Sequence, residues 1–196
     1  MSQPSFEDKD IHYAYNSIHD FFDHFSLSGA LQDIDSIIMA ATRNKIWKKS
    51  TPYMLLYYMQ KLEQLCTSVF TIHCLSLPIA NAILDQPKNA QPDMAITQNY
   101  VGRQIQQTSW NYFPRSLTAT QYHNPYKAIK KFCLYKTQQE WSQVLKELTE
   151  YALGNDTIND NYPPYNILTI RLRLLQLIEA CHLLEVRTKA QATKVQ

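Results

Sequence analysis

Residues 51–74 read TPYMLLYYMQKLEQLCTSVFTIHC, and this stretch decides the fold class. Thr51 can cap the start of a helix, and Pro52 suits the first helical position. Apolar positions then recur every three or four residues in two overlapping series, which are Leu55, Met59, Leu62, Cys66, Val69, His73 and Leu56, Met59, Glu63, Cys66, Phe70. Because two such stripes need neighbours on two sides, the stretch predicts a long helix inside a bundle.

The same helical periodicity extends outward in both directions. It predicts helices over about residues 5–25, 28–44, 51–75, 125–135, 138–153 and 164–187. Thr137, three residues before Glu140, predicts a capping box at the start of one of them. The alternating four-three spacing on the long helices favours packing at about +20°. We therefore expect one all-α domain over residues 1–196, a helical bundle of about five to six helices with an irregular, partly ordered insertion.

The insertion is expected over about residues 85–124. Pro87, Pro92 and Pro114 interrupt the helical pattern there, and asparagine and glutamine are frequent. The segment nevertheless contains several aromatic residues, and disordered linkers rarely carry so many. We therefore expect an ordered insertion with one short helix or a small hairpin.

Composition narrows the function classes. The 196 residues include only 3 glycines, and the formal net charge is +2. Few glycines disfavour a glycine-rich phosphate loop, and the small charge predicts no strong overall attraction to nucleic acid. The cysteines at 66, 74, 133 and 181 lack the spacing of a secreted disulfide framework, so we expect free thiols in a reducing compartment. Without a signal-peptide core or a long apolar run, we expect a cytoplasmic protein that does not enter membranes.

The sequence contains none of the common catalytic motifs, which favours a protein that is not an enzyme and needs no cofactor. One constellation suggests otherwise. Glu179 and His182 have the Glu-x-x-His spacing found in di-iron and di-manganese carboxylate bundles, and Glu63 interrupts an apolar stripe on another helix. These three side chains could hold iron, manganese or zinc. The competing interpretation is a buried polar cluster whose members pair internally.

Two groups of basic residues could face a nucleic acid. Arg43, Lys48 and Lys49 lie between the second and third predicted helices, and Lys127, Lys130 and Lys131 lie on a later one. Clustered basic residues with nearby aromatic rings are typical of such surfaces. Lysines near helix ends are equally typical of a solvated rim, and no nucleic-acid-reading motif accompanies them.

The chain has 13 tyrosines, a residue that suits protein interfaces because it combines an apolar body with a polar tip. The candidate interaction residues are Tyr53, Tyr57, Trp110, Tyr112 and Phe113. We expect first a non-catalytic helical interaction or regulatory protein that binds a protein partner or itself. The alternatives are a nucleic-acid-associated regulator and a metal-dependent enzyme.

Overall fold

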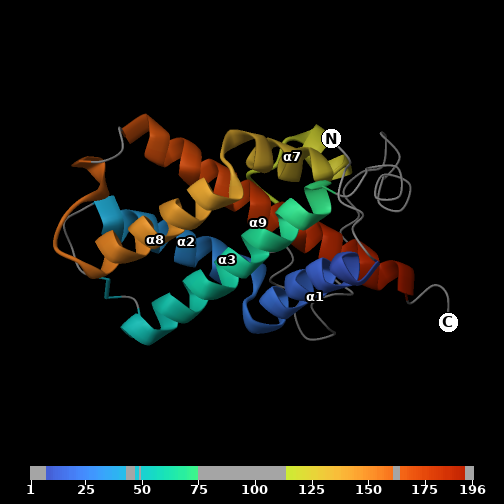
Figure 1. Cartoon of the computed structure of the whole chain (residues 1–196), viewed down its shortest axis with the longest axis horizontal. Helices are drawn as coiled ribbons and strands as arrows, with labels where there is room; N and C mark the ends of the chain where they lie inside the picture. Colours follow the sequence, from blue (N-terminus) through green and yellow to red (C-terminus); the bar gives the residue numbers. More distant parts are fainter. Residues whose placement is uncertain (1–7, 43–46, 49, 75–113, 161–163, 193–196) are drawn as a thin grey trace.

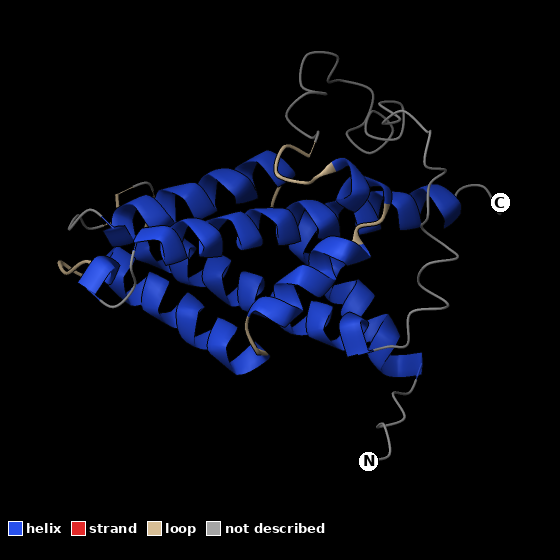
Figure 2. Cartoon of the chain, turned by 90° about the horizontal axis from the view of Figure 1, so that it is seen from above, coloured by secondary structure: helices blue, strands red, loops and turns tan. Residues whose placement is uncertain are grey.

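The computed structural model describes residues 8–42, 47–48, 50–74, 114–160 and 164–192. Within these ranges the chain forms seven α-helices and one short 3-10 helix (Figure 1). They are α1 (Asp8–His24), α2 (Leu27–Thr42), α3 (Pro52–Cys74), α6 (Ala119–His123), α7 (Tyr126–Tyr135), α8 (Gln138–Leu153), η2 (Ile158–Asp160) and α9 (Pro164–Ala192). Figure 2 shows only helices and loops in the described part, which confirms the all-α prediction.

The helices pack as a bundle in which α9 runs the length of the molecule (Figure 1). α1 packs on α3, α2 packs on α8 and α9, and α7 packs on α9 and α3. α3 also contacts α8, so it has neighbours on two sides, as its two apolar stripes predicted. None of the described helices combines the length and the apolarity needed to cross a lipid bilayer.

Every long helix contributes side chains to the apolar core. Its fully buried members include Ile18, Phe21, Ile34, Ile37, Leu62, Leu65, Ile129, Phe132, Trp141, Leu148, Leu174 and Ile178. Trp141 stacks on Phe132 with ring centroids 4.2 Å apart, and its indole N–H donates to the Phe132 carbonyl at 3.2 Å. Each buried Leu, Ile or Phe contributes roughly 1.5–3 kcal/mol, so this core supplies most of the drive to fold.

The predicted helices match described helices closely, with one difference: the last helix continues to Ala192 instead of ending near residue 187. α6 is a short helix in the final part of the predicted insertion, where one short helix or a small hairpin was expected. α6 begins with a capping box between Thr118 and Gln121. The Thr137–Glu140 capping box at the start of α8 is confirmed. Most of the insertion, including Trp110, Tyr112 and Phe113, lies outside the described residues.

Two predicted apolar stripes are partly wrong. On α3, Leu56 and Glu63 are exposed, and the second buried side uses Tyr58 and Leu65 instead. On α9, the four-three spacing of Leu168, Leu172, Leu175, Glu179, His182 and Val186 predicted one buried stripe, but Leu168 and Leu172 are exposed. The buried apolar positions in that half of the helix are Ile167, Ile170, Leu174, Leu175, Leu177 and Ile178, of which only Leu175 belongs to the predicted stripe. α9 is apolar on nearly every side, so spacing alone could not select the face that packs.

Candidate functional site

The C-terminal half of α9 buries a set of polar side chains. Its members are Gln176, Glu179, His182, Glu185 and Arg187. Buried polar groups need hydrogen-bond partners, and these partners reveal what each residue does. Glu185 contacts His19 on α1, with Oε1 lying 2.7 Å from the imidazole Nδ1. Gln176, Glu179 and Arg187 bind the segment from Arg115 to His123.

Glu179 holds a turn of backbone. Its carboxylate accepts the backbone N–H groups of Arg115, Ser116 and Leu117 at 2.7, 2.8 and 3.1 Å. Burial raises the pKa of Glu179, the three backbone N–H groups lower it, and burial is the larger effect. The carboxylate therefore acts as a structural anchor for three consecutive peptide groups.

Gln176 and Arg187 hold the same segment on either side of Glu179. The Gln176 amide donates to the Ser116 carbonyl at 2.9 Å. The Arg187 guanidinium donates to the carbonyls of Tyr122 and His123 at 2.6 and 3.2 Å, at the end of α6. These contacts fix the residues between Arg115 and His123 on α9, directly before α7 begins.

The three candidate metal ligands do not form a metal-binding group. Glu63 is exposed on α3 and accepts a hydrogen bond from the Ser142 hydroxyl on α8. Glu179 faces the backbone of residues 115–117, and the imidazole of His182 meets the edge of Phe22 at 5.1 Å between centroids. Among the described residues no three His, Cys, Asp or Glu side chains converge on a possible metal position.

A cleft of about 350 Å³ lies between α3 and α8. It is lined by Glu63, Cys66, Thr67, Gln138, Gln139 and Ser142. Its polar side chains bond across it, since Gln138 donates to the Thr67 hydroxyl at 3.3 Å and Ser142 donates to Glu63. The polar side chains of the cleft therefore mainly hold α3 and α8 together.

The thiols are placed for packing rather than for nucleophilic chemistry. Cys66 and Cys181 are buried, and Cys133 is half-buried. Burial raises the pKa of the Cys66 and Cys181 thiols, and it raises the pKa of Cys133 to about 12. A thiol must ionise to act as a nucleophile, so these three are inert near neutral pH. Cys74, at the end of α3, is exposed.

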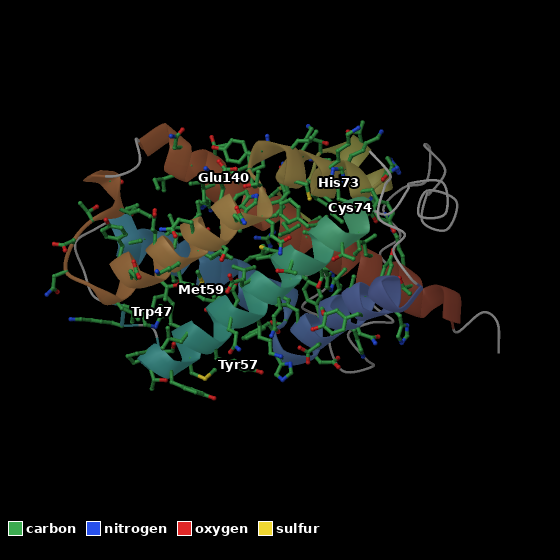
Figure 3. The ribbon with its side chains drawn as sticks, in the orientation of Figure 1. Trp47, Tyr57, Met59, His73, Cys74 and Glu140 are labelled. Atoms are coloured by element: carbon green, nitrogen blue, oxygen red, sulfur yellow. The ribbon has the colours of Figure 1, made fainter. Side chains whose placement is uncertain are left out.

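Exposed apolar side chains gather at the start of α3. We call Tyr53, Met54, Leu56 and Tyr57 the tyrosine patch. Tyr53, Met54 and Leu56 are 70%, 45% and 50% exposed. The rings of Tyr53 and Tyr57 stack with centroids 6.4 Å apart, and Figure 3 places Tyr57 at the outer edge of the bundle. The structure thus brings together two of the five predicted interaction residues.

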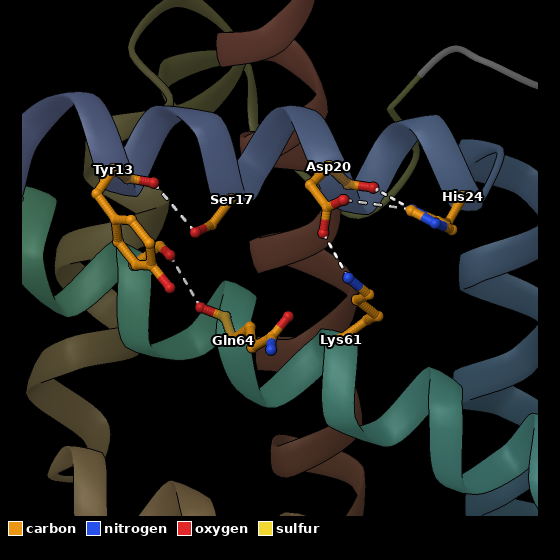
Figure 4. A network of polar contacts seen from close by, with 7 residues as sticks. Tyr13, Ser17, Asp20, His24, Lys61 and Gln64 are labelled. Atoms are coloured by element: carbon orange, nitrogen blue, oxygen red, sulfur yellow. Dashed lines mark hydrogen bonds and ion pairs between the residues drawn. The ribbon is translucent and has the colours of Figure 1, made fainter.

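Figure 4 shows a polar network in which Asp20 of α1 contacts His24 on the same helix and Lys61 on α3. The Lys61 ammonium donates to Asp20 at 2.6 Å, and this bond is the main cause of the raised pKa of Lys61. His24 donates from Nδ1 to the Asp20 carbonyl at 2.7 Å. Lys61 and His24 then contact the Tyr57 ring, each with centroid distances of 5.7 Å. These contacts therefore fix the position of the Tyr57 ring within the tyrosine patch.

The candidate nucleic-acid-binding residues do not form one surface in the described part of the structure. Lys127, Lys130 and Lys131 are exposed together on α7, and we call them the lysine face. Lys48 is exposed elsewhere, before α3, while Arg43 and Lys49 lie outside the described residues. The opposite side of α7 is buried against the bundle through Tyr126, Ile129 and Phe132.

No protein-family model, curated protein or solved structure matches this chain, so its function is inferred from these surfaces and contacts.

Proposed function

We propose that this chain is a non-catalytic interaction protein that associates with a second copy of itself through the tyrosine patch. The observation that carries the proposal is the exposure of Tyr53, Met54 and Leu56 within one turn of α3. Contiguous exposed apolar surface in a folded protein marks interaction sites, and tyrosine is enriched at the centre of interfaces.

The chemistry of the patch favours a second copy as the partner. Its four side chains carry no charge, so two copies can meet without like-charge repulsion. A surface that pairs with itself about a twofold axis meets the same residues on the other side, and most soluble oligomers use such contacts. Stacked tyrosine rings and aliphatic side chains are complementary to one another in this arrangement.

Tyr57, one of the four side chains of the patch, is also held in place before any partner binds. Tyr57 packs against Phe25, with ring centroids 6.0 Å apart, and Lys61 and His24 contact the same ring. Side chains that are already ordered lose less conformational entropy on binding, which increases the affinity that a small surface can reach.

Sedimentation equilibrium over about 1–200 µM protein tests the proposal. The wild-type chain should form dimers, and the variant Tyr53→Ser/Leu56→Ser should weaken dimerisation by at least about 30-fold, since it removes four anchors from each symmetric dimer and these contribute at least about 2 kcal/mol together. The matched control is Leu168→Ser/Leu172→Ser, which replaces two exposed leucines on α9 and should dimerise like the wild type. A wild-type chain that stays monomeric throughout, or a patch variant that dimerises normally, refutes the proposal.

A further inference from the structure

The segment before and through α7 has an uneven charge. Residues 114–139 contain no Asp or Glu, although the whole chain has a formal charge of only +2. The basic residues of this segment are Arg115, Lys127, Lys130, Lys131 and Lys136. The remainder of the chain holds more acidic than basic residues, so positive charge is concentrated on this part of the surface.

The helix arranges three of these charges as one face. Lys127, Lys130 and Lys131 are spaced three and four residues apart, which places them side by side on α7, and all three are exposed. The buried acids of the neighbouring α9 are already engaged, because Glu179 binds backbone N–H groups and Glu185 contacts His19. They therefore do not cover the lysine face.

We propose that the lysine face binds the phosphate backbone of duplex nucleic acid, without preference for base sequence. Lysine is a point charge suited to phosphate, and contacts to the backbone supply the sequence-independent part of nucleic-acid affinity. Lys127 and Lys131 are separated by about 6 Å along the helix, which brings both within reach of neighbouring phosphates. This surface is separate from the tyrosine patch and does not depend on the proposed self-association.

Two other anionic partners fit α7 less well. A helix that lies on a lipid surface inserts a broad apolar side, but Ile129 and Phe132 of α7 are packed against the bundle, and Leu134 is a single exposed leucine among the lysines. Proteins that bind single strands offer exposed rings for base stacking. On α7, Tyr126 and Phe132 are buried and Tyr135 is half-buried beneath Lys136 and Arg173.

His73 does not add to the charge near neutral pH. It lies at the end of α3, beside α7 (Figure 3). Burial and the nearby Lys130 ammonium both lower the pKa of His73 below its ordinary value of 6.5. The lysines alone therefore provide the positive charge, and binding should be steady between about pH 7 and 8.

Fluorescence anisotropy with a labelled duplex of about 10 base pairs, which is too short to contact both lysine faces of a dimer, tests this inference on the 196-residue chain. Three phosphate contacts predict a slope near −2.7 in a plot of log K against log salt, which is about 40-fold weaker binding at 200 mM than at 50 mM KCl. The variant Lys127→Gln/Lys130→Gln/Lys131→Gln should bind at least about 30-fold more weakly at 50 mM, with a slope near zero.

Two controls separate the lysine face from general charge effects. The triple lysine-to-arginine variant keeps the charge at the same positions and should bind like the wild type. Lys146→Gln removes one exposed lysine from α8 and should change the affinity by less than about twofold. Circular dichroism confirms that each variant is folded.

Three results would overturn the inference. The first is no binding of the duplex at about 50 µM protein and 25 mM KCl. The second is a glutamine variant that binds like the wild type. The third is tighter binding to an oligothymidylate strand, or to vesicles containing phosphatidylserine, than to the duplex.

Discussion

Replacing Glu179 by glutamine tests the contact that joins α9 to the segment before α7. The carboxylate accepts three backbone N–H groups, from Arg115, Ser116 and Leu117. A glutamine side chain has nearly the same shape, but its single amide oxygen can accept at most two of these bonds. Its NH₂ group would face the remaining backbone donor, which leaves at least one buried N–H group without an acceptor.

The expected cost follows from that lost bond. A hydrogen bond to a charged acceptor contributes about 1.5–3 kcal/mol to stability. Three such bonds would together contribute more than one alone. Burial of the carboxylate, which raises the pKa of Glu179, offsets part of this sum. We therefore expect Glu179→Gln to lower the free energy of unfolding by about 2 kcal/mol, or the melting temperature by about 4–8 °C. Glu179→Ala removes every acceptor and should cost about 4 kcal/mol.

Urea unfolding followed by circular dichroism measures the global effect, and hydrogen exchange measures the local one. The amides of residues 115–117 should exchange much faster in the variant, while amides in the core of α8 change only as global stability falls. Glu150→Gln is the matched control, because Glu150 is an exposed carboxylate on α8 and its loss should cost less than about 0.5 kcal/mol. A Glu179→Gln protein as stable as the wild type, with unchanged exchange at residues 115–117, would refute the anchoring role.

Two further predictions concern buried hydroxyl and thiol groups. Tyr58→Phe removes the bond that the Tyr58 hydroxyl donates to the Ala30 carbonyl at 2.9 Å, so it should cost about 1 kcal/mol in urea unfolding, whereas Tyr53→Phe should cost nothing measurable. Because the pKa of Cys66, Cys133 and Cys181 is raised above 9.0, the unfolded chain ionises first. Under reducing conditions, stability should be full below pH 9 and fall above it by about 1.4 kcal/mol per pH unit for each thiol. Urea midpoints that stay constant from about pH 8 to 10.5 would contradict this reasoning.

Local helical signals predicted most of the fold. The 51–74 stretch gave both ends of α3 to within about one residue, because Thr51, Pro52 and the apolar period are all local features. The Thr137–Glu140 capping box is similarly local. The face that α9 buries was not predictable in the same way. Its leucines and isoleucines surround the helix, so the choice depends on how α2 and α7 pack against it.

The candidate site was only partly predictable, because its contacts are distant in sequence. The polar interruption at Glu179 correctly indicated a buried group that needs partners. Those partners are backbone N–H groups 62–64 residues away, and no side-chain pattern identifies a backbone donor. The lysine face was visible as a cluster, but its significance depends on two facts of packing. Ile129 and Phe132 of α7 are packed against the bundle, and the acids Glu179 and Glu185 of α9 bind other groups.

The two proposed surfaces lie at opposite ends of α3, which has a consequence for duplex binding. Tyr57 and His73 are separated by about 24 Å along the helix, and α7 lies beside the His73 end. In a dimer that joins two tyrosine patches with the α3 helices end to end, the lysine faces would lie about 50 Å apart, a distance that roughly 15 base pairs span. A duplex of about 40 base pairs can then contact both faces, and two linked contacts bind far more tightly than one.

The wild-type chain should bind this duplex at least about 10-fold more tightly than a 10-base-pair duplex. The variant Tyr53→Ser/Leu56→Ser should lose this preference for the longer duplex without changing its affinity for the short one. If the patch variant keeps the full preference for the longer duplex, the two surfaces do not act together in one dimer.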